Sequence, residues 1–267
     1  MEESDLGALT DDAIAGSWRI WQRERGHRYS IDDVATAWEA VSARPDATRV
    51  LDLGCGIGSV TLMLAYKLRG ARIDAIEAQA LSHGLAARNL ARNELTDRVT
   101  LHRGDLRDPT WIERIGGDFQ LVTGTPPYFD PKKGSPSTDS QRTYARIEMR
   151  GGVEDYLRAG ARLLAEDGIM VVCGDAQRPD RARAGAAAAG LFVRARRDVV
   201  PREGKGALFT IWTVGRRGEG AEQELPAIVA RDAAGARLPI QHTLREFFDL
   251  SIREDEPASP VLRARSQ

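Results

Sequence analysis

Cysteine and histidine are scarce in this chain of 267 residues. It holds two cysteines, Cys55 and Cys173, each inside an apolar run, and only four histidines. This count excludes the disulfide framework that stabilises many small secreted domains. No cysteine and histidine cluster has the spacing of a zinc site. We therefore expect a protein without a metal centre.

Long apolar runs are also missing. No segment approaches the ~18 consecutive apolar residues that indicate a membrane span. The first five residues are mostly acidic, and no apolar stretch of signal-peptide type follows them. The sequence therefore predicts a cytoplasmic protein that does not insert into a membrane.

An excess of positive charge is absent as well. Lysine and arginine total 38 against 39 acidic residues, which gives a formal net charge of −1. Such a chain is not a nonspecific nucleic-acid coat, so any nucleic-acid binding must come from a local patch. Hydrophobic residues make up 42% and charged residues 29%, a composition typical of a globular protein with a sizeable core.

Short apolar runs alternate with helical patterns between about residues 47 and 215. This alternation indicates a largely parallel, doubly wound α/β sheet of the Rossmann-like type. The runs predict strands at 49–53, 71–76, 98–102, 119–123 and 168–173, and the periodic segments predict helices at 59–68, 80–93, 153–164 and 181–190. Two further strand-like runs, 191–197 and 208–214, have no convincing helix between them. They predict a closing hairpin at a sheet edge, with the last strand antiparallel.

The chain divides into three predicted parts. Residues 1–46 form an N-terminal cap segment, and residues 47–217 form the core. Within the core, residues 124–152 make a long polar insertion, which we interpret as a substrate loop because loops of this length are usually functional or mobile. Residues 218–267 form a C-terminal extension, and its tail after Glu256 has the composition of a disordered segment.

The segment after the first core strand is the most informative part of the sequence. It reads Asp52-Leu53-Gly54-Cys55-Gly56-Ile57-Gly58, and its glycines allow a sharp turn and close approach of a ligand. A dinucleotide-binding loop would place its third glycine at position 59, which is Ser59 here. The D-x-G-x-G-x-G spacing is instead that of the nucleotide loop in S-adenosylmethionine (SAM)-dependent methyltransferases. A purely structural tight turn is the alternative.

Two acidic residues follow the next two strands. Glu77 lies where a carboxylate can accept hydrogen bonds from both ribose hydroxyls of a nucleoside. Asp105, which Leu106 follows, could accept one from an adenine amino group. Solvated loop carboxylates are the alternative for both.

The fourth core strand ends in Gly124-Thr125-Pro126-Pro127-Tyr128-Phe129. Two prolines directly after a strand end its hydrogen-bond ladder and fix φ, so they predict a rigid loop. This loop should lie at the carboxyl edge of the sheet, where open α/β sheets bind their ligands.

With this loop the sequence resembles the class I methyltransferases that carry an Asn-Pro-Pro-Tyr signature and methylate exocyclic or amide nitrogens. Within that class it is most similar to the bacterial tRNA adenine-N6 methyltransferases that modify valine tRNA. The resemblance spans most of the chain, through segments 21–22, 26–32, 51–58, 88–89, 125–129, 145–148, 201–205, 231–235 and 244–248 together with Glu77 and Asn93.

The resemblance implies SAM as the cofactor and a seven-stranded sheet. The residues that it assigns to the cofactor are Arg28, Asp52, Gly54, Cys55, Gly56, Gly58, Glu77, Asp105 and Leu106. It assigns catalysis to Thr125, Pro126, Pro127 and Tyr128. In the family, the Asn side chain and the first proline carbonyl accept the two N–H groups of the amine, and the aromatic ring stacks on the base.

Thr125 stands where the signature has Asn. A threonine hydroxyl can accept a hydrogen bond, but threonine has no amide carbonyl and is β-branched. Three functions therefore remain open: adenine-N6 methylation in tRNA, methylation of a protein glutamine amide or small-molecule amine, and a SAM- or RNA-binding module without catalysis.

Basic and aromatic residues follow the signature and suit a nucleic-acid strand, which offers phosphates and base faces. We assign substrate binding to Phe129, Lys132, Lys133 and Arg146, and predict RNA, specifically tRNA, as the partner. A solvated polar loop is the alternative. The same choice applies to Arg28, which either lies over the cofactor or is solvated.

Overall fold

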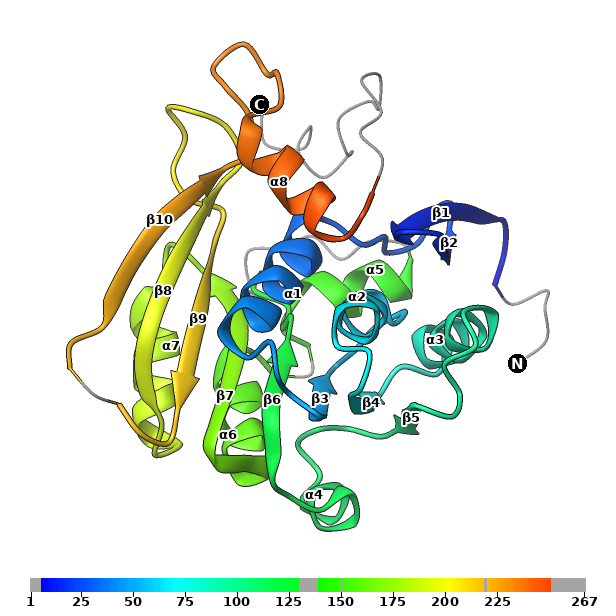
Figure 1. Ribbon diagram of the computed structural model, residues 1–267, viewed down its shortest axis with the longest axis horizontal. Coiled ribbons are helices and arrows are strands. Elements are labelled where there is room, and N and C mark those ends of the chain that lie inside the picture. The colour runs from blue at the N-terminus through cyan, green and yellow to red at the C-terminus, as the bar shows by residue number, and fades with distance from the viewer. Residues whose placement is uncertain (1–5, 130–138, 150, 219, 251–267) are drawn as a thin grey trace.

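The computed structural model describes residues 6–129, 139–149, 151–218 and 220–250. Its strands are β1 (Leu9–Ala15), β2 (Trp18–Arg23), β3 (Arg49–Leu53), β4 (Arg72–Glu77), β5 (Val99–Arg103), β6 (Phe119–Gly124), β7 (Leu164–Asp175), β8 (Phe192–Val200), β9 (Phe209–Gly215) and β10 (Gln223–Val229). Its helices are α1 (Ile31–Ala43), α2 (Ser59–Lys67), α3 (Ala80–Arg92), α4 (Pro109–Ile115), α5 (Ser140–Arg146), α6 (Val153–Leu163), α7 (Pro179–Ala188) and α8 (Pro239–Phe247). Figure 1 shows their arrangement.

The central sheet has the strand order β10-β8-β9-β7-β6-β3-β4-β5. The strands from β5 to β7 pair in parallel, and β9 is antiparallel to both β7 and β8. The predicted α/β class, the mostly parallel sheet and the antiparallel last core strand are therefore confirmed. The predicted count of seven strands is one too low, because the sheet has eight strands in the described part of the chain.

The eighth strand comes from the C-terminal extension. β10 pairs in parallel with β8 and is interrupted by a register shift between Leu225 and Ile228, where Pro226 lies. A proline cannot donate to a ladder, so the sequence did not suggest a strand there, but an edge position tolerates it. The Pro226 carbonyl accepts a hydrogen bond from the Arg197 side chain at 2.7 Å. The β8–β9 hairpin is therefore not the edge that the sequence predicted.

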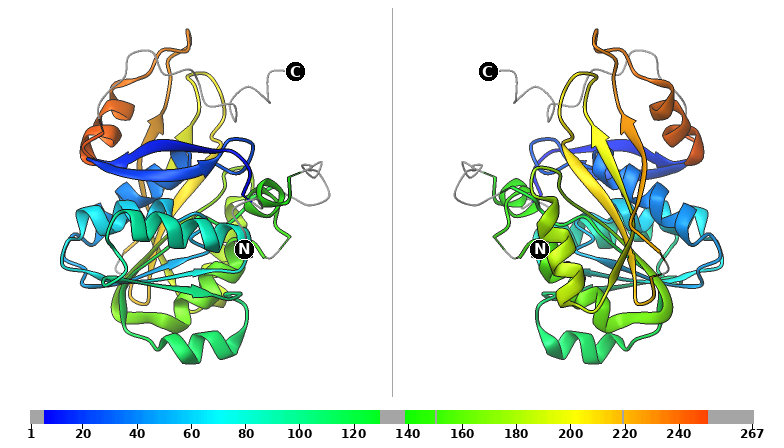
Figure 2. Two further views of the ribbon diagram at one scale, coloured as in Figure 1. Left: turned by 90° about the vertical axis from the view of Figure 1, so that its right-hand side faces the viewer. Right: turned by 90° about the vertical axis from the view of Figure 1, so that its left-hand side faces the viewer.

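Helices cover both faces of this sheet. One face carries α1, α2 and α3, and the other carries α4, α6 and α7 (Figure 2). Two buried apolar clusters correspond to these layers, one on each side of the sheet. In the described part of the chain, no helix is long and apolar enough to cross a membrane.

The N-terminal segment is attached to α3 by two asparagines. The Asn89 side chain accepts from Trp21 N and donates to Trp21 O, and Asn93 makes the same pair of bonds with the backbone of Arg19. The two amides thus imitate a neighbouring strand for β2, which forms a two-stranded antiparallel sheet with β1. Arg88 and Arg92 lie against the Trp21 ring.

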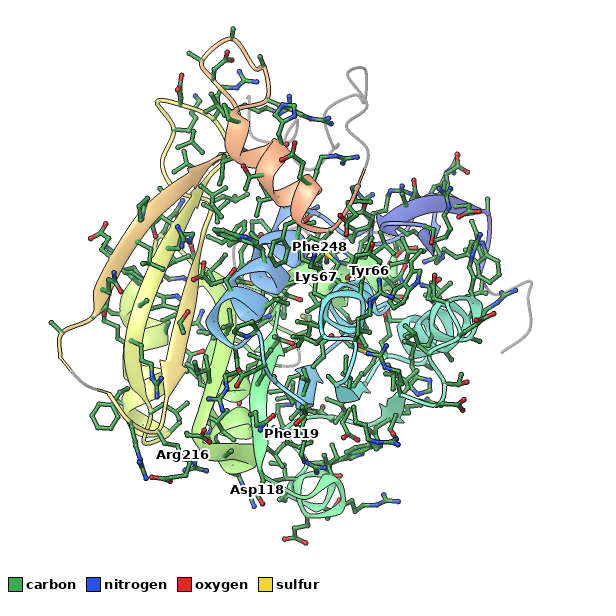
Figure 3. The ribbon with its side chains drawn as sticks, viewed as in Figure 1. Tyr66, Lys67, Asp118, Phe119, Arg216 and Phe248 are labelled. Carbon is green, nitrogen blue, oxygen red and sulfur yellow. The ribbon has the colours of Figure 1, made fainter. Side chains whose placement is uncertain are left out.

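The end of α8 packs onto the core near the end of α2. Phe248 is fully buried, and its carbonyl accepts from Gly16 N at 2.8 Å. The Tyr66 hydroxyl donates to Asp249, and the Lys67 ammonium lies 4.6 Å from the Phe247 ring centroid. Figure 3 shows Phe248 beside Tyr66 and Lys67. The C-terminal extension is therefore packed against the core through residue 250.

Candidate functional site

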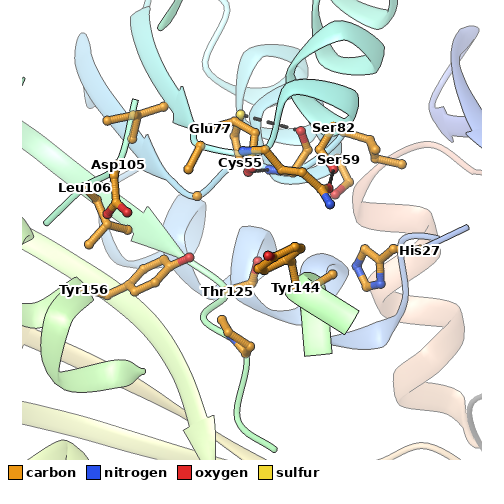
Figure 4. Close-up of a pocket in the computed structure, with 18 of the residues that line it drawn as sticks. His27, Cys55, Ser59, Glu77, Ser82, Asp105, Leu106, Thr125, Tyr144 and Tyr156 are labelled. Carbon is orange, nitrogen blue, oxygen red and sulfur yellow. Dashed lines mark hydrogen bonds between the residues drawn. The ribbon is translucent and has the colours of Figure 1, made fainter. Parts of the chain in front are cut away.

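The carboxyl ends of β3, β4, β5 and β6 meet at one edge of the sheet because these four neighbouring strands are parallel. They surround an open cavity, which we call the first cavity. In Figure 4, Asp105, Leu106 and Tyr156 lie toward one end of it, and His27, Ser59 and Ser82 toward the other. The glycine loop and Thr125 face it between these ends.

The glycine loop turns through left-handed backbone conformations. Gly54, Gly56 and Gly58 have φ values of 62°, 59° and 88°, which favour glycine. A Cβ on Gly54 would also overlap the hydroxyl of Tyr156, a buried residue of α6. Gly54, Cys55 and Gly56 line the first cavity, whereas Gly58 is the N-cap of α2 and does not.

Asp52 does not face the first cavity but is buried behind the glycine loop. It is 1% exposed, and its two carboxylate oxygens accept from the hydroxyls of Thr61 and Thr123 at 2.6 and 2.9 Å. Burial raises its pKa to about 6, against the lowering effect of these hydrogen bonds. The structure therefore places Asp52 between α2 and β6, away from the ligand space.

Two backbone amides hold the Glu77 side chain at the edge of the first cavity. Its carboxylate oxygens accept from Gly56 N at 3.0 Å and from Gln79 N at 2.6 Å, and the residue lines the first cavity. Asp105 and Leu106 line it too. The Asp105 carboxylate is engaged by the guanidinium of Arg107, at 2.9 and 2.6 Å, so an adenine amino group would share it with that cation.

Thr125 lies where the first cavity meets a second one. The second cavity shares His27, Asp33, Thr125 and Ala145 with the first. Pro126, Tyr128 and Phe129 also line it, whereas Pro127 lines the first cavity. The Tyr128 ring stacks on Phe209 with a centroid distance of 6.1 Å and an interplanar angle of 27°. Burial raises the pKa of Tyr128, so its phenol stays neutral.

Sequence reasoning missed two titratable groups at this junction, Asp33 and His27. Asp33 is buried and accepts from Ser59 Oγ at 2.9 Å and from Ser30 N at 2.9 Å. Burial and the neighbouring Asp32 raise its pKa to about 8. Burial also lowers the pKa of His27, which favours a neutral imidazole. In the sequence, the acidic pair Asp32 and Asp33 at the start of α1 could have indicated the Asp33 site.

Helix α5 covers the site from the insertion after the signature. The buried Gln141 side chain accepts from His27 N at 3.2 Å and donates to Ser82 Oγ, which ties α5 to α3 and the N-terminal segment. Tyr144 lines the first cavity, and Arg146 lines the second with its guanidinium 5.2 Å from the Phe129 ring centroid. Lys132 and Lys133 lie outside the described residues.

Arg28 is placed beside the second cavity and not the first. Its guanidinium donates to Thr10 Oγ1 at 2.6 Å and to Asp12 at 2.9 Å. These bonds direct the side chain to the N-terminal hairpin, so this geometry favours neither a solvated loop charge nor contact with a ligand of the first cavity.

Residues 31–141 match the family model of the methyltransferase small domain. The chain is thus similar to that family over less than half of its length. It is 31% identical over 170 residues to the tRNA1(Val) (adenine(37)-N6)-methyltransferase of Citrobacter koseri, which covers 63% of this chain and 66% of the relative, just under two thirds. It is 35% identical over 174 residues to the ribosomal protein uL3 glutamine methyltransferase of Bradyrhizobium diazoefficiens, covering 63% of this chain and 48% of that protein.

The fold agrees with this family. A predicted O-methyltransferase from Agrobacterium tumefaciens superposes with a TM-score of 0.63 at 19% identity, covering 84% of this chain and all of the other. The family match over residues 31–141 and this fold both point to SAM as the cofactor.

The first cavity fits this cofactor. It combines a backbone cradle at Gly54 and Gly56, a rim carboxylate at Glu77 and an apolar contact at Leu106, which suit an amino-acid end, a ribose and an adenine ring. Among the described residues, no group of three histidine, cysteine or acidic side chains could hold a metal ion.

Proposed function

We propose that this protein methylates an exocyclic amine of a nucleobase, adenine N6 in tRNA, with SAM as the methyl donor. The observation that carries the proposal is the position of Thr125 at the junction of the two cavities. Glu77, Asp105, Leu106 and the loop at 54–56 would hold the cofactor in the first cavity. The target base would enter the second cavity, between the signature and Arg146.

The residues at the junction suit this reaction. SAM supplies an electrophilic methyl group on a sulfonium sulfur. An exocyclic amine is a poor nucleophile because its lone pair is delocalised into the ring. The Thr125 hydroxyl and the Pro126 carbonyl would accept its two N–H groups, and the Tyr128 ring would stack on the base. These contacts localise the lone pair toward the first cavity, so positioning and electrostatics supply the rate enhancement.

The transfer is balanced by loss of one proton from nitrogen. The N–C bond forms as the S–C bond breaks, S-adenosylhomocysteine leaves, and the methylated nitrogen releases a proton. The neutral imidazole of His27 lines both cavities and is the base to which we assign this proton. No strongly basic residue is required, since the protonated amine is itself acidic.

A second substrate is favoured by one comparison. The relative from Bradyrhizobium is named for a protein glutamine, and its identity to this chain is 35%. A glutamine amide offers the same pair of N–H groups as an adenine amine, so the same acceptors would serve it. Residue Thr125 in place of Asn is compatible with either substrate.

The deciding experiment measures transfer of labelled methyl from SAM to unmodified total RNA and, in parallel, to protein extract. The RNA is digested to nucleosides and separated. Label in N6-methyladenosine supports the proposal. Label in protein only moves the assignment to the glutamine amide, and cofactor binding without label in any pool, unrescued by Thr125→Asn, indicates a non-catalytic module.

A further inference from the structure

A third cavity adjoins the proposed target-base cavity. It shares Arg28, Ser30, Asp32 and Tyr128 with the second cavity. Its walls come from parts of the chain that are far apart in sequence: the N-terminal segment, the loop between β8 and β9, and the C-terminal extension with α8. We call it the arginine groove.

The groove concentrates positive charge. Four arginines line it, Arg28, Arg231, Arg237 and Arg245, against two aspartates, Asp12 and Asp32. Asp12 pairs with Arg28 and Asp32 accepts from Ser30 Oγ, so the lining carries more positive than negative charge. The whole chain has a net charge of only −1, so this is a local feature of the groove wall.

Arg231 is the most informative of these side chains. Its Nε is buried and has no hydrogen-bond partner among the described residues, while its Nη1 donates to the Gly235 carbonyl at 2.7 Å. Arg231 and Arg237 are also paired through a backbone bridge. Burial and the charges of Arg237 and Arg202 lower the pKa of Arg231. Two neighbouring guanidinium groups repel each other, and an anion bound between them would offset this repulsion.

The floor of the groove is aromatic and apolar. Tyr29 and Tyr128 line it, with the fully buried Phe209 stacked behind the Tyr128 ring, and Leu208 and Leu244 lie along its wall. Because the Tyr128 ring is assigned to the target base, Tyr29 is the aromatic side chain left for a second base, and a phosphate would bind the guanidinium groups, so the groove suits a nucleotide. An acidic peptide would satisfy the arginines but would leave the aromatic floor without a flat partner.

Segments that the proposed reaction does not use converge on this groove. The loop 201–205 and the turn 231–235 are held together by hydrogen bonds from Glu203 N to Arg231 O and from Ala233 N to the Glu203 carboxylate. Pro201 and Arg231 from these two segments line the groove, and α8 closes it. The C-terminal extension therefore builds a wall next to the site, besides adding a strand to the sheet.

We propose that the arginine groove binds the base and phosphate of the RNA nucleotide that adjoins the methylated adenine. The C-terminal extension would thereby select the substrate strand. This inference rests on the proposed function, because it needs an RNA whose target base occupies the second cavity.

The test compares two double variants of the full chain. Arg231→Gln/Arg237→Gln removes two charges from the groove. Arg114→Gln/Arg217→Gln removes two exposed charges from α4 and the end of β9, which lie at the opposite end of the molecule from α8 (Figure 1). For each protein, the dissociation constants for SAM and for an unmodified valine tRNA transcript are measured over a range of salt concentrations, together with methyl transfer.

We expect the groove variant to bind the transcript at least tenfold more weakly than the control variant, with the same affinity for SAM. The slope of log affinity against log salt should fall by about 0.7–0.9 for each phosphate that the variant no longer neutralises. Equal RNA affinity in the two variants, with a wild type that methylates RNA, overturns the groove and leaves the proposed function standing. A wild type that neither binds nor methylates RNA overturns the proposed function itself.

Two further measurements distinguish the proposal from misfolding of the variant and from binding of a different ligand. A transcript with 4-thiouridine next to the target adenine is cross-linked to the wild-type protein, and adducts within 199–209 or 230–245 support the groove. Adducts confined to 139–146 contradict it. Binding of poly-glutamate that is abolished in the groove variant, while RNA binding is retained, would assign the groove to an acidic polypeptide instead.

Discussion

At the scale of single residues, Tyr128 is the side chain that connects three parts of the site. It belongs to the proline loop, lines the second cavity and stacks on Phe209 at the floor of the arginine groove. Its ring does not line the first cavity. Its contribution to the substrate can therefore be separated from any contribution to the cofactor.

We predict that Tyr128→Ala lowers kcat/KM for RNA by about 10- to 100-fold, because base stacking contributes ~1–3 kcal/mol. The dissociation constant for SAM, measured by calorimetry, should change less than twofold. Tyr128→Phe is the matched control and should keep most of the activity, since it keeps the aromatic ring and removes only a neutral hydroxyl. Equal reductions in activity and in SAM affinity would contradict this assignment.

Asp33 gives a prediction for stability against pH. Its pKa is about 8 in the folded protein and near 3.8 in the unfolded chain. Between about pH 4 and pH 8 the folded state holds a proton that the unfolded state has released, so this group destabilises the protein progressively as pH rises. Asp33→Asn lacks this titration and keeps a similar shape.

The free energy of unfolding of Asp33→Asn relative to wild type should therefore increase with pH across this window, by at most about 1.4 kcal/mol per pH unit. Urea unfolding at pH 5, 6, 7 and 8 measures it, with the exposed Asp97→Asn as the control substitution. A difference that stays constant from pH 5 to pH 8 would show that Asp33 is ionised throughout.

At the scale of elements, Asn89 is the more buried of the two asparagines that join β2 to α3. Asn89 is 0% exposed and bonds to Trp21 N, Trp21 O and Ile57 O, the last a carbonyl of the glycine loop. It therefore connects the N-terminal hairpin to the glycine loop. The sequence indicated only that Asn89 takes part in a family resemblance, and its role depends on a contact across 68 residues.

Asn89→Ala should destabilise the protein by about 1–3 kcal/mol, because it leaves buried backbone groups without partners. Hydrogen exchange should show faster exchange of the Trp21 amide in this variant. Asn93→Ala removes a similar but less buried clamp and should have a smaller effect. Unchanged exchange at Trp21 would mean that β1 alone holds the hairpin strand in place.

At the scale of the whole molecule, ligand binding should raise thermal stability. A cofactor at 100 times its dissociation constant stabilises the folded state by about 2.7 kcal/mol, which corresponds to a rise in Tm of roughly 5–10 °C for a chain of this size. Glu77→Gln removes the carboxylate that lines the first cavity and should reduce the rise in Tm. Glu113→Gln, on the exposed face of α4, should leave the rise in Tm unchanged. Thermal scans with and without SAM measure this, and equal shifts in the two variants would remove Glu77 from the cofactor site.

The core elements were predictable because their signals are local. Buried strands such as β3 and β6 are continuous apolar runs, and the glycines of residues 54–58 are needed for backbone conformations that the chain adopts there. The order of these elements predicted the α/β class and the edge at which a ligand should bind. Glu77 and Thr125 could therefore be assigned to that edge from the sequence alone.

The tertiary structure decided what depends on contacts between distant segments. Asp52 has the spacing of a ligand residue, yet it turns inward to two threonines, and Arg28 turns to Asp12. The strand β10, with its proline, is stable because β8 offers it an edge. The arginine groove exists only where the N-terminal segment, the β8–β9 loop and α8 meet, and periodicity along a chain holds no information about such a meeting.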